Sequence, residues 1–339
     1  MRRSPLIVLL VAAPLALAAA GCGGDDGADV RAIGTDASAS GASGSSASGS
    51  SASGSSASGS SASGTGLSLD DTQTAATGDA LVQAAVAEYQ DYVTEQTDQI
   101  IARTTVFTDA VRAGRLAAAK AAYAPSREPW ERIEPIAGLI EATDGAVDSR
   151  VDDFAGPGDP GFTGWHRLEY ILWERNTTAG AARFANRLDR DLAALKAGIA
   201  DLEIPAAAMA LGASELIQEV SEGKITGEED RYSKTDLWDF AANVEGAEQI
   251  IELLEPALEK ADPELLARIE AGFDDLDASL EALEKGDGYV LFCQENDAYP
   301  APDLCPETTV TQAQIDTMKG QLAGLSEDLA LVPGVLGLS

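Results

Sequence analysis

Apolar side chains return every three or four positions through most of the chain after about residue 79, the spacing of one buried face of an α-helix. The first such stretch predicts a long helix on Val82, Val86, Tyr89, Val93, Ile100 and Phe107. The same pattern predicts helices over residues 127–142, 164–175, 181–202, 234–260, 262–285 and 311–331, and one that begins at Pro205. The alternating runs of β-branched residues that indicate strands are missing from the sequence.

These elements predict an all-α fold. Alanine is abundant and aromatic residues make up 5% of the chain, which suits closely packed helices. Asp262-Pro263 places a proline at the first position of a predicted helix, where it is favoured. About 260 residues in about eight helices would form one large bundle, or two smaller bundles packed together.

The first 21 residues have the parts of a secretory signal peptide. Two arginines open it, and the apolar run over residues 6–20 is short for a membrane span. Cys22 follows Ala19-Ala20-Gly21, a small-residue cleavage site typical of a lipoprotein. We predict that residues 1–21 are removed, that Cys22 is lipidated, and that the chain is anchored at the extracytoplasmic face of the cell membrane. The alternative is an ordinary cleavable signal with a chance cysteine.

Residues 22–77 lack a pattern that could pack. Within them, residues 44–64 repeat Gly-Ser-Ser-Ala-Ser. Such a sequence cannot bury enough apolar surface to offset the entropy lost on ordering. We predict a disordered tether over residues 22–77, with a reach of about 40 Å, and a folded domain over residues 78–339.

Acidic residues outnumber basic residues 56 to 23, and the formal net charge is −33. Phosphate backbones would be repelled, so nucleic acid is not an expected partner. Direct contact with anionic lipid is disfavoured for the same reason. A strongly negative field concentrates cations, although most of these acids need do no more than keep the protein soluble.

Two cysteines remain after Cys22. Cys293 and Cys305 bracket a short segment that contains two prolines. In an oxidising compartment they predict a disulfide, which would stabilise the fold by about 3 kcal/mol. The alternatives are two free thiols or a pair of metal ligands.

The candidate chemistry lies around the chain's single histidine. His166 and Glu169 are three residues apart and share a helical face. Glu131 and Glu134 have the same spacing, and Pro135 predicts a kink beside them. Buried unpaired carboxylates are costly and call for a cation or a shared proton. The alternative is pairing with arginines, for which the sequence offers Arg132, Arg150, Arg167 and Arg231.

Several motifs in a fixed order carry a resemblance to a known family. They are Glu-Arg-Ile-Glu-Pro-Ile at 131–136, Asp-Ser-Arg-Val-Asp-Asp at 148–153, Phe-Thr-Gly-Trp-His-Arg-Leu-Glu-Tyr at 162–170 and Ile-Thr-Gly-Glu-Glu-Asp-Arg-Tyr-Ser at 225–233. They resemble the imelysin-like domain of the iron-uptake lipoproteins of the EfeO and EfeM type, over about residues 80–331.

The resemblance implies two packed four-helix bundles and one metal site. It implies metal ligation by His166, Glu169, Glu131, Glu134, Asp148 and Glu229, with Glu228 as the alternative to Glu229. It also implies an iron permease and a haem-peroxidase-like protein as partners. Longer members carry an additional cupredoxin domain where this chain has its Gly/Ser-rich stretch, so a second metal site of that kind is not expected.

One imidazole among several carboxylates suits iron as Fe²⁺ or Fe³⁺, and would also accept Cu²⁺ or Zn²⁺. We therefore expect an iron-binding protein and not an enzyme. A metal-dependent peptidase is the main alternative, but the usual zinc site of a peptidase needs two histidines. A binding module for haem or for an acidic polysaccharide is the other. Haem would need His166 as its axial ligand, and an acidic polymer would need a basic groove.

Overall fold

The structure, a computed structural model, describes residues 79–338. The predicted signal peptide, Cys22 and the whole of the predicted tether lie outside the described residues. Within residues 79–338, none of the helices has both the length and the apolar character that a membrane crossing requires.

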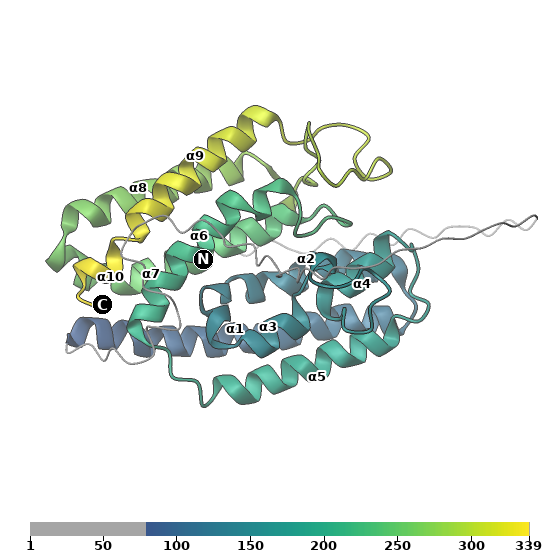
Figure 1. Cartoon of the computed structure of the whole chain (residues 1–339), viewed down its shortest axis with the longest axis horizontal. Coiled ribbons are helices and arrows are strands. Elements are labelled where there is room, and N and C mark those ends of the chain that lie inside the picture. Colours follow the sequence, from purple (N-terminus) through teal and green to yellow (C-terminus); the bar gives the residue numbers. More distant parts are fainter. Residues whose placement is uncertain (1–78, 339) are drawn as a thin grey trace, which may run out of the picture. The chain divides into compact units, whose positions relative to one another are not determined.

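Four helices of the first half form a bundle in which each packs against two neighbours. They are α1 (Ala80–Arg112), α2 (Leu116–Glu131), α4 (Gly164–Trp173) and α5 (Ala182–Ile199). The short helix α3 (Glu141–Val147) packs against α4 and α5. Figure 1 shows α1 and α5 side by side along one edge of this bundle.

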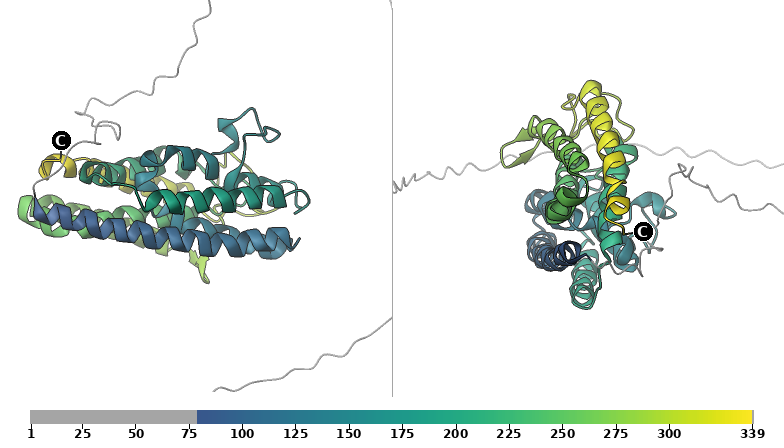
Figure 2. Two further views of the ribbon diagram at one scale, coloured as in Figure 1. Left: turned by 90° about the horizontal axis from the view of Figure 1, so that it is seen from below. Right: turned by 90° about the vertical axis from the view of Figure 1, so that its left-hand side faces the viewer.

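The second half repeats this arrangement. The bundle consists of α6 (Ala206–Glu222), α7 (Asp236–Ala261), α8 (Pro263–Glu281) and α9 (Gln312–Leu329). The short helix α10 (Val332–Val335) closes against α6 and α7, and the hairpin of β1 (Glu284–Lys285) and β2 (Gly288–Tyr289) follows α8. In the left view of Figure 2 the axes of the long helices lie roughly along one line, from side to side across the molecule. The expected all-α fold of two four-helix bundles is confirmed.

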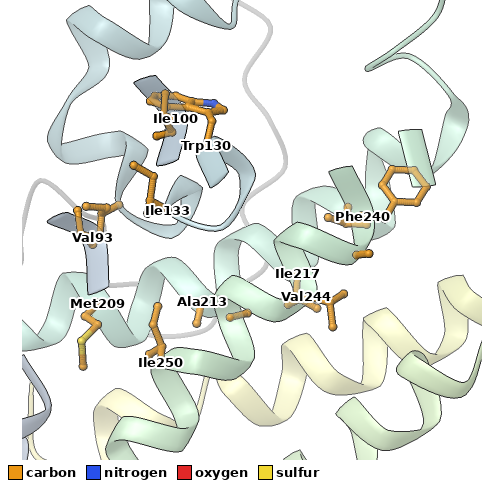
Figure 3. Close-up of a cluster of buried hydrophobic side chains, with 14 of the residues drawn as sticks. Val93, Ile100, Trp130, Ile133, Met209, Ala213, Ile217, Phe240, Val244 and Ile250 are labelled. Carbon is orange, nitrogen blue, oxygen red and sulfur yellow. The ribbon is translucent and has the colours of Figure 1, made fainter. Parts of the chain in front are cut away.

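One apolar core joins the two bundles. Figure 3 shows side chains from α1 and α2 of the first bundle facing those of α6 and α7 of the second, among them Trp130, Met209 and Val244. Helix α7 packs against both α1 and α2. At Gly246 of α7 the backbone of Arg132 comes so close that a Cβ atom would lie 2.3 Å from its carbonyl oxygen. This contact fixes the end of α2 against the second bundle.

The prediction of one helix over residues 127–142 is wrong. Helix α2 begins earlier, at Leu116, and ends at Glu131, with Pro125 and Pro129 inside it. The Ala-rich stretch before Pro125 is a strong helix former, but it has too few large apolar residues to show a periodic face. The predicted kink at Pro135 is absent as well, because Pro135 lies in the first turn of a separate 3₁₀ helix, η2 (Glu134–Leu139), where proline needs no hydrogen-bond partner.

The other predicted helices form, with shifts of a few residues at their ends. The helix predicted to reach residue 285 ends at Glu281 and is followed by the hairpin. The short 3₁₀ helices η3 (Val151–Asp153) and η4 (Lys224–Thr226) were not predicted, nor were α3 and α10 as separate helices. Elements this short do not show a helical period.

Candidate metal centre

The six residues predicted as ligands come from separate elements and lie in one region. Glu131 ends α2, Glu134 begins η2, and Asp148 directly follows α3. His166 and Glu169 belong to α4, and Glu229 lies in the turn after η4. All are buried except Glu134, which is partly exposed.

A tight junction between α3 and α4 brings Asp148 to His166. Gly164, the first residue of α4, has a φ of +76°, and a Cβ atom there would lie 2.0 Å from the carbonyl oxygen of Val147. Only glycine suits both the dihedral angle and the contact. The Thr163 hydroxyl donates to the carbonyl of Ala146 at 2.9 Å, which holds the same junction. Asp148 is oriented further by the indole N–H of Trp130, which donates to its Oδ2 at 2.9 Å.

The two ring nitrogens of His166 face different carboxylates. Nε2 lies 3.4 Å from Oδ1 of Asp148 and 3.3 Å from Oε1 of Glu229, but no described residue makes a hydrogen bond to it. Nδ1 lies 3.4 Å from Oε2 of Glu169 and 3.4 Å from the hydroxyl of Tyr123. The hydrogen bonding at Nδ1 keeps a proton there, so Nε2, which faces Asp148 and Glu229, is the nitrogen that can give up its proton and bind a metal.

Glu169 is held mainly by the loop before α7. Its Oε1 accepts hydrogen bonds from the backbone N–H groups of Tyr232 and Ser233 at 2.8 and 2.7 Å, and from the Ser233 hydroxyl at 2.9 Å. Asp230 of the same loop accepts a hydrogen bond from the Tyr123 hydroxyl at 2.8 Å. His166 therefore belongs to two groups with the spacing of metal ligands, one with Asp148 and Glu229 and one with Glu169 and Asp230.

Two buried cations that the sequence did not single out partner these acids. Arg127 donates hydrogen bonds to Glu131 and Asp148, and to Glu229 at 3.1 Å. Lys224 lies 3.1 Å from Glu131 and 2.7 Å from Glu134. The spacing of Arg127 four residues before Glu131 could have indicated the first pair. No feature of the sequence around Lys224 predicts that it pairs with these acids.

Of the four arginines proposed as alternative partners, only Arg150 reaches the predicted ligands. Its Nη1 lies 2.7 Å from Glu229 and 3.2 Å from Glu228, the proposed alternative to Glu229. Arg132 pairs with Glu245 and Arg231 with Asp152. Arg167 has no ion pair among residues 79–338. Arginine pairing therefore accounts for only part of the buried negative charge.

The buried carboxyl groups of this region outnumber its buried cations. The carboxyl groups belong to Glu131, Asp148, Glu169, Glu229, Asp230, Asp236 and Asp239, and the cations to Arg127, Lys224 and Lys234. Burial raises the pKa of Asp239, and the nearby charge of Asp230 raises it further. Burial also raises the pKa of Glu134, and Lys224 lowers it only in part. The region thus carries an excess of acid groups that a bound cation would relieve.

The two acids that face Nε2 remain ionised. Burial would raise the pKa of Asp148, but the charge of Arg127 and the adjacent imidazole of His166 lower it by more. Burial likewise opposes ionisation of Glu229, yet Lys224, His166 and Arg150 bring its pKa well below the usual value. Asp148 and Glu229 therefore offer charged oxygen ligands at neutral pH.

A cavity of about 240 Å³ lies against the same side of the centre. Asp148, Glu229 and Glu134 contribute to its wall, together with Asp144 and Glu219. Burial and the charge of Asp148 raise the pKa of Asp144 to about 7. A cation could reach the Nε2 side of His166 along this acid-lined cavity.

The donor spacing fits a small metal ion. Neighbouring ligand atoms of an octahedral ion with bonds of about 2.1 Å lie about 3 Å apart. The distances of 3.3 and 3.4 Å from Nε2 to the Glu229 and Asp148 oxygens are close to this value. Only small movements of these side chains would bring all three donor atoms into contact with one bound ion.

The segment between Cys293 and Cys305 packs against the loop that carries Glu229 and Asp230. The two cysteines form a disulfide with their Cα atoms 5.4 Å apart. Within the segment, Asp297 forms a partly buried ion pair with Lys234 at 2.8 Å, and the ring of Tyr299 lies 4.3 Å from the guanidinium of Arg231. The segment therefore contacts the loop immediately beside the residues that hold Glu169.

Comparison with known proteins identifies the family. The imelysin family model, Peptidase_M75, matches residues 85–323. The chain is 48% identical over 254 residues to the iron uptake system component EfeO of Yersinia pseudotuberculosis serotype I (strain IP32953), covering 75% of this chain and 64% of that protein. It is 44% identical over 270 residues to EfeO of Escherichia coli (strain K12), covering 79% of this chain and 68% of that protein.

A solved structure supports the fold alone. The crystal structure of a protein from Parabacteroides distasonis ATCC 8503 superposes with a TM-score of 0.57 at 16% sequence identity, covering 80% of this chain and 100% of the other. The chain spans about two thirds of the length of its EfeO relatives, 64% of the Yersinia protein and 68% of the E. coli protein. The matched family model and the identity to EfeO confirm the resemblance carried by the sequence motifs, and this chain belongs to the imelysin family.

Proposed function

We propose that this chain is the iron-binding component of an iron uptake system, anchored through lipid on Cys22 at the extracytoplasmic face of the cell membrane. The names of its EfeO relatives support the uptake role. The observation that carries the proposal is the buried Nε2 of His166, which has no hydrogen-bond partner in residues 79–338 and faces two ionised carboxylates.

In this proposal the cargo is an iron ion bound by Nε2 of His166, Oδ1 of Asp148 and Oε1 of Glu229. Glu169 keeps the imidazole oriented by accepting the Nδ1 proton, as carboxylates beside metal-bound histidines commonly do. Glu131 and Glu134 add negative charge nearby and share Lys224. Cu²⁺ and Zn²⁺ would compete for the same donors.

Arg127 makes the proposed capture reversible. Its guanidinium donates to Asp148 and to Glu229. An incoming ion must compete with this internal cation, which limits the affinity and lets the carboxylates be neutralised again after release. A carrier needs this balance, because cargo held too firmly could not be passed on.

The proposal is for binding and not for peptide hydrolysis, although the family model carries a peptidase name. The chain has one histidine, so the two-histidine zinc site common in peptidases cannot form within it. The partners we propose are an iron permease and a haem-peroxidase-like protein of the same uptake system.

Isothermal titration of the metal-free protein with anaerobic Fe²⁺, and separately with a weak Fe³⁺ chelate, tests the proposal. The changes His166→Ala and Asp148→Asn should each weaken iron binding by about tenfold or more, since ligand-sphere changes commonly cost 10- to 100-fold. Glu264→Gln, at an exposed carboxylate of α8, is the matched control and should leave affinity unchanged. Equal affinity in all variants would exclude His166 and Asp148 as ligands.

A further inference from the structure

A group of arginines lies on α4, on α5 and in the turn after α4 of this otherwise acidic chain. Arg167 is at its centre, and Arg175, Arg183, Arg187 and Arg190 surround it as exposed side chains. Arg187 pairs with Asp191. None of the other four has an ion pair within residues 79–338, in a chain where acids outnumber bases more than two to one.

The central arginine is buried without hydrogen-bond partners. Arg167 is 9% exposed, and its Nε and Nη1 atoms have no hydrogen-bond partner in the described part of the chain. Guanidinium N–H groups left unpaired inside a protein lose solvation without gaining an acceptor. An acceptor from outside the chain would remove this cost.

Two guanidinium groups converge on one aromatic ring. The guanidinium carbons of Arg167 and Arg183 lie 4.7 and 4.6 Å from the ring centre of Phe184. Phe162 and Tyr170 also flank Arg167, at 5.4 and 5.8 Å. Ring faces favour cations, so Phe184 gathers two like charges in one neighbourhood, and an anion bound beside them would offset their repulsion.

Hollows of about 270 and 340 Å³ open on this group, and both are lined by Arg167, Arg183 and Phe184. Among the described residues, the only carboxylate on their walls belongs to Asp159, which lines the larger hollow. Both Asp159 oxygens accept backbone N–H groups, at Gly161 (2.8 Å) and Ala155 (3.3 Å). Asp159 is therefore engaged by its own loop and does not pair with Arg167.

We propose that Arg167 and Arg183 form a binding site for a phosphate-class oxyanion, separate from the metal centre. The planar fork of arginine matches the paired oxygens of such an anion. The hollows are large enough for a phosphate group with some of its water. The group could reach the site as free phosphate or as the headgroup of a phospholipid.

Titration of the metal-free chain with inorganic phosphate, at constant ionic strength set by chloride, tests the proposal. Vesicles of phosphatidylglycerol and phosphatidylcholine in equal parts, compared with phosphatidylcholine alone, distinguish the lipid source. Phosphate should bind, and Arg183→Met should weaken it by about tenfold, the effect expected from losing one charge-assisted hydrogen bond. Since Arg183 is exposed, this variant should still fold.

Arg167→Met should weaken phosphate binding at least as much, with a circular dichroism spectrum to show that the helices persist. Arg268→Met is the matched control, because Arg268 is an exposed arginine already paired with Asp328, and it should bind phosphate normally. Binding of phosphate alone would assign the site to a free anion, and additional binding of the anionic vesicles would assign it to a headgroup. No phosphate or vesicle binding, or binding that survives both variants, would overturn the proposal whatever the result for iron.

Discussion

At the scale of single residues, His166 shows how one imidazole can serve a buried acidic site. Its Nδ1 is hydrogen-bonded to Glu169, while its Nε2 faces Asp148 and Glu229 without a hydrogen bond. Burial and the charge of Arg127 lower the pKa of His166, but the neighbouring carboxylates of Asp148, Glu169 and Glu229 raise it by more, to well above its ordinary value. When no metal is bound, the imidazole of His166 is therefore protonated on both nitrogens, and so positively charged, at neutral pH.

Iron binding should therefore release a proton and weaken as the pH falls. Asp148 and Glu229 have lowered pKa values and stay ionised. The protonation of His166 therefore determines how iron binding depends on pH between about pH 5 and 7. We expect affinity to fall by about tenfold for each pH unit in this range, as for displacement of one proton. Calorimetry in buffers of different ionisation enthalpy would measure the protons released. Binding that neither releases protons nor depends on pH would contradict the assignment of His166 as a ligand.

The residue types of the site could be predicted from sequence, but their pairing could not. The motifs identified His166 and the carboxylates because these side chains lie within short segments of recognisable order. Arg127 and Lys224 were missed because their roles depend on α2 and η4 meeting in space, across 93 residues in the case of Lys224 and Glu131. Long-range pairing of this kind leaves no periodic signal.

At the scale of elements, the end of α2 is fixed by the close approach of α7 at Gly246. Gly246→Ala would place a Cβ atom 2.3 Å from the carbonyl oxygen of Arg132, and backbone cannot move aside as a side chain can. We expect the free energy of unfolding to fall by about 2 kcal/mol or more, as for other overpacked sites. Urea denaturation measures this change.

Gly198→Ala on α5 is the matched control, since a Cβ atom there would contact nothing within 4 Å. Alanine in an exposed helix should raise stability by up to about 1 kcal/mol. Similar losses in both variants would show that the contact at Gly246 has no special role.

The disulfide segment should matter for both stability and metal affinity. Replacing Cys293 and Cys305 by serine frees a short loop, and we expect unfolding to become easier by about 3 kcal/mol. Asp297→Asn removes the partner of buried Lys234 and should weaken iron binding several-fold by loosening the loop that holds Glu169. Asp303→Asn, exposed in the same segment, is the control. If Asp297→Asn left the iron affinity unchanged, the contact between the disulfide segment and this loop would have no effect on the metal site.

Helices with a regular apolar face could be predicted from sequence, whereas the irregular stretch after α2 could not. Residues 131–153 contain η2, α3 and η3, and each is too short to show a period. Their positions depend on tertiary contacts, such as that between Gly164 and Val147. These short elements supply Glu134 and Asp148, so the least predictable part of the fold lies closest to the site.

At the scale of the whole molecule, the negative charge opposes folding. The net charge is −33, and the effect is visible on α7 and α8, where burial and the charge of Asp277 raise the pKa of Glu248 to about 7. Salt screens such repulsion over about 10 Å at 0.1 M. We expect the free energy of unfolding in urea to be about 1 kcal/mol higher in 0.5 M than in 0.02 M sodium chloride. A fall in stability with added salt would mean that attractive pairs outweigh the repulsion.

The two bundles contribute different parts of the proposed cargo site. Helix α4 of the first bundle supplies His166, and Asp148 follows α3 beside it, whereas Glu229 comes from the connection between α6 and α7 of the second. A captured ion would thus cross-link the two bundles of the protein. A docking partner that moved the two bundles slightly apart would lengthen the bond to Glu229 and leave the ion on His166 and Asp148, so unloading could begin without acid or a change of oxidation state.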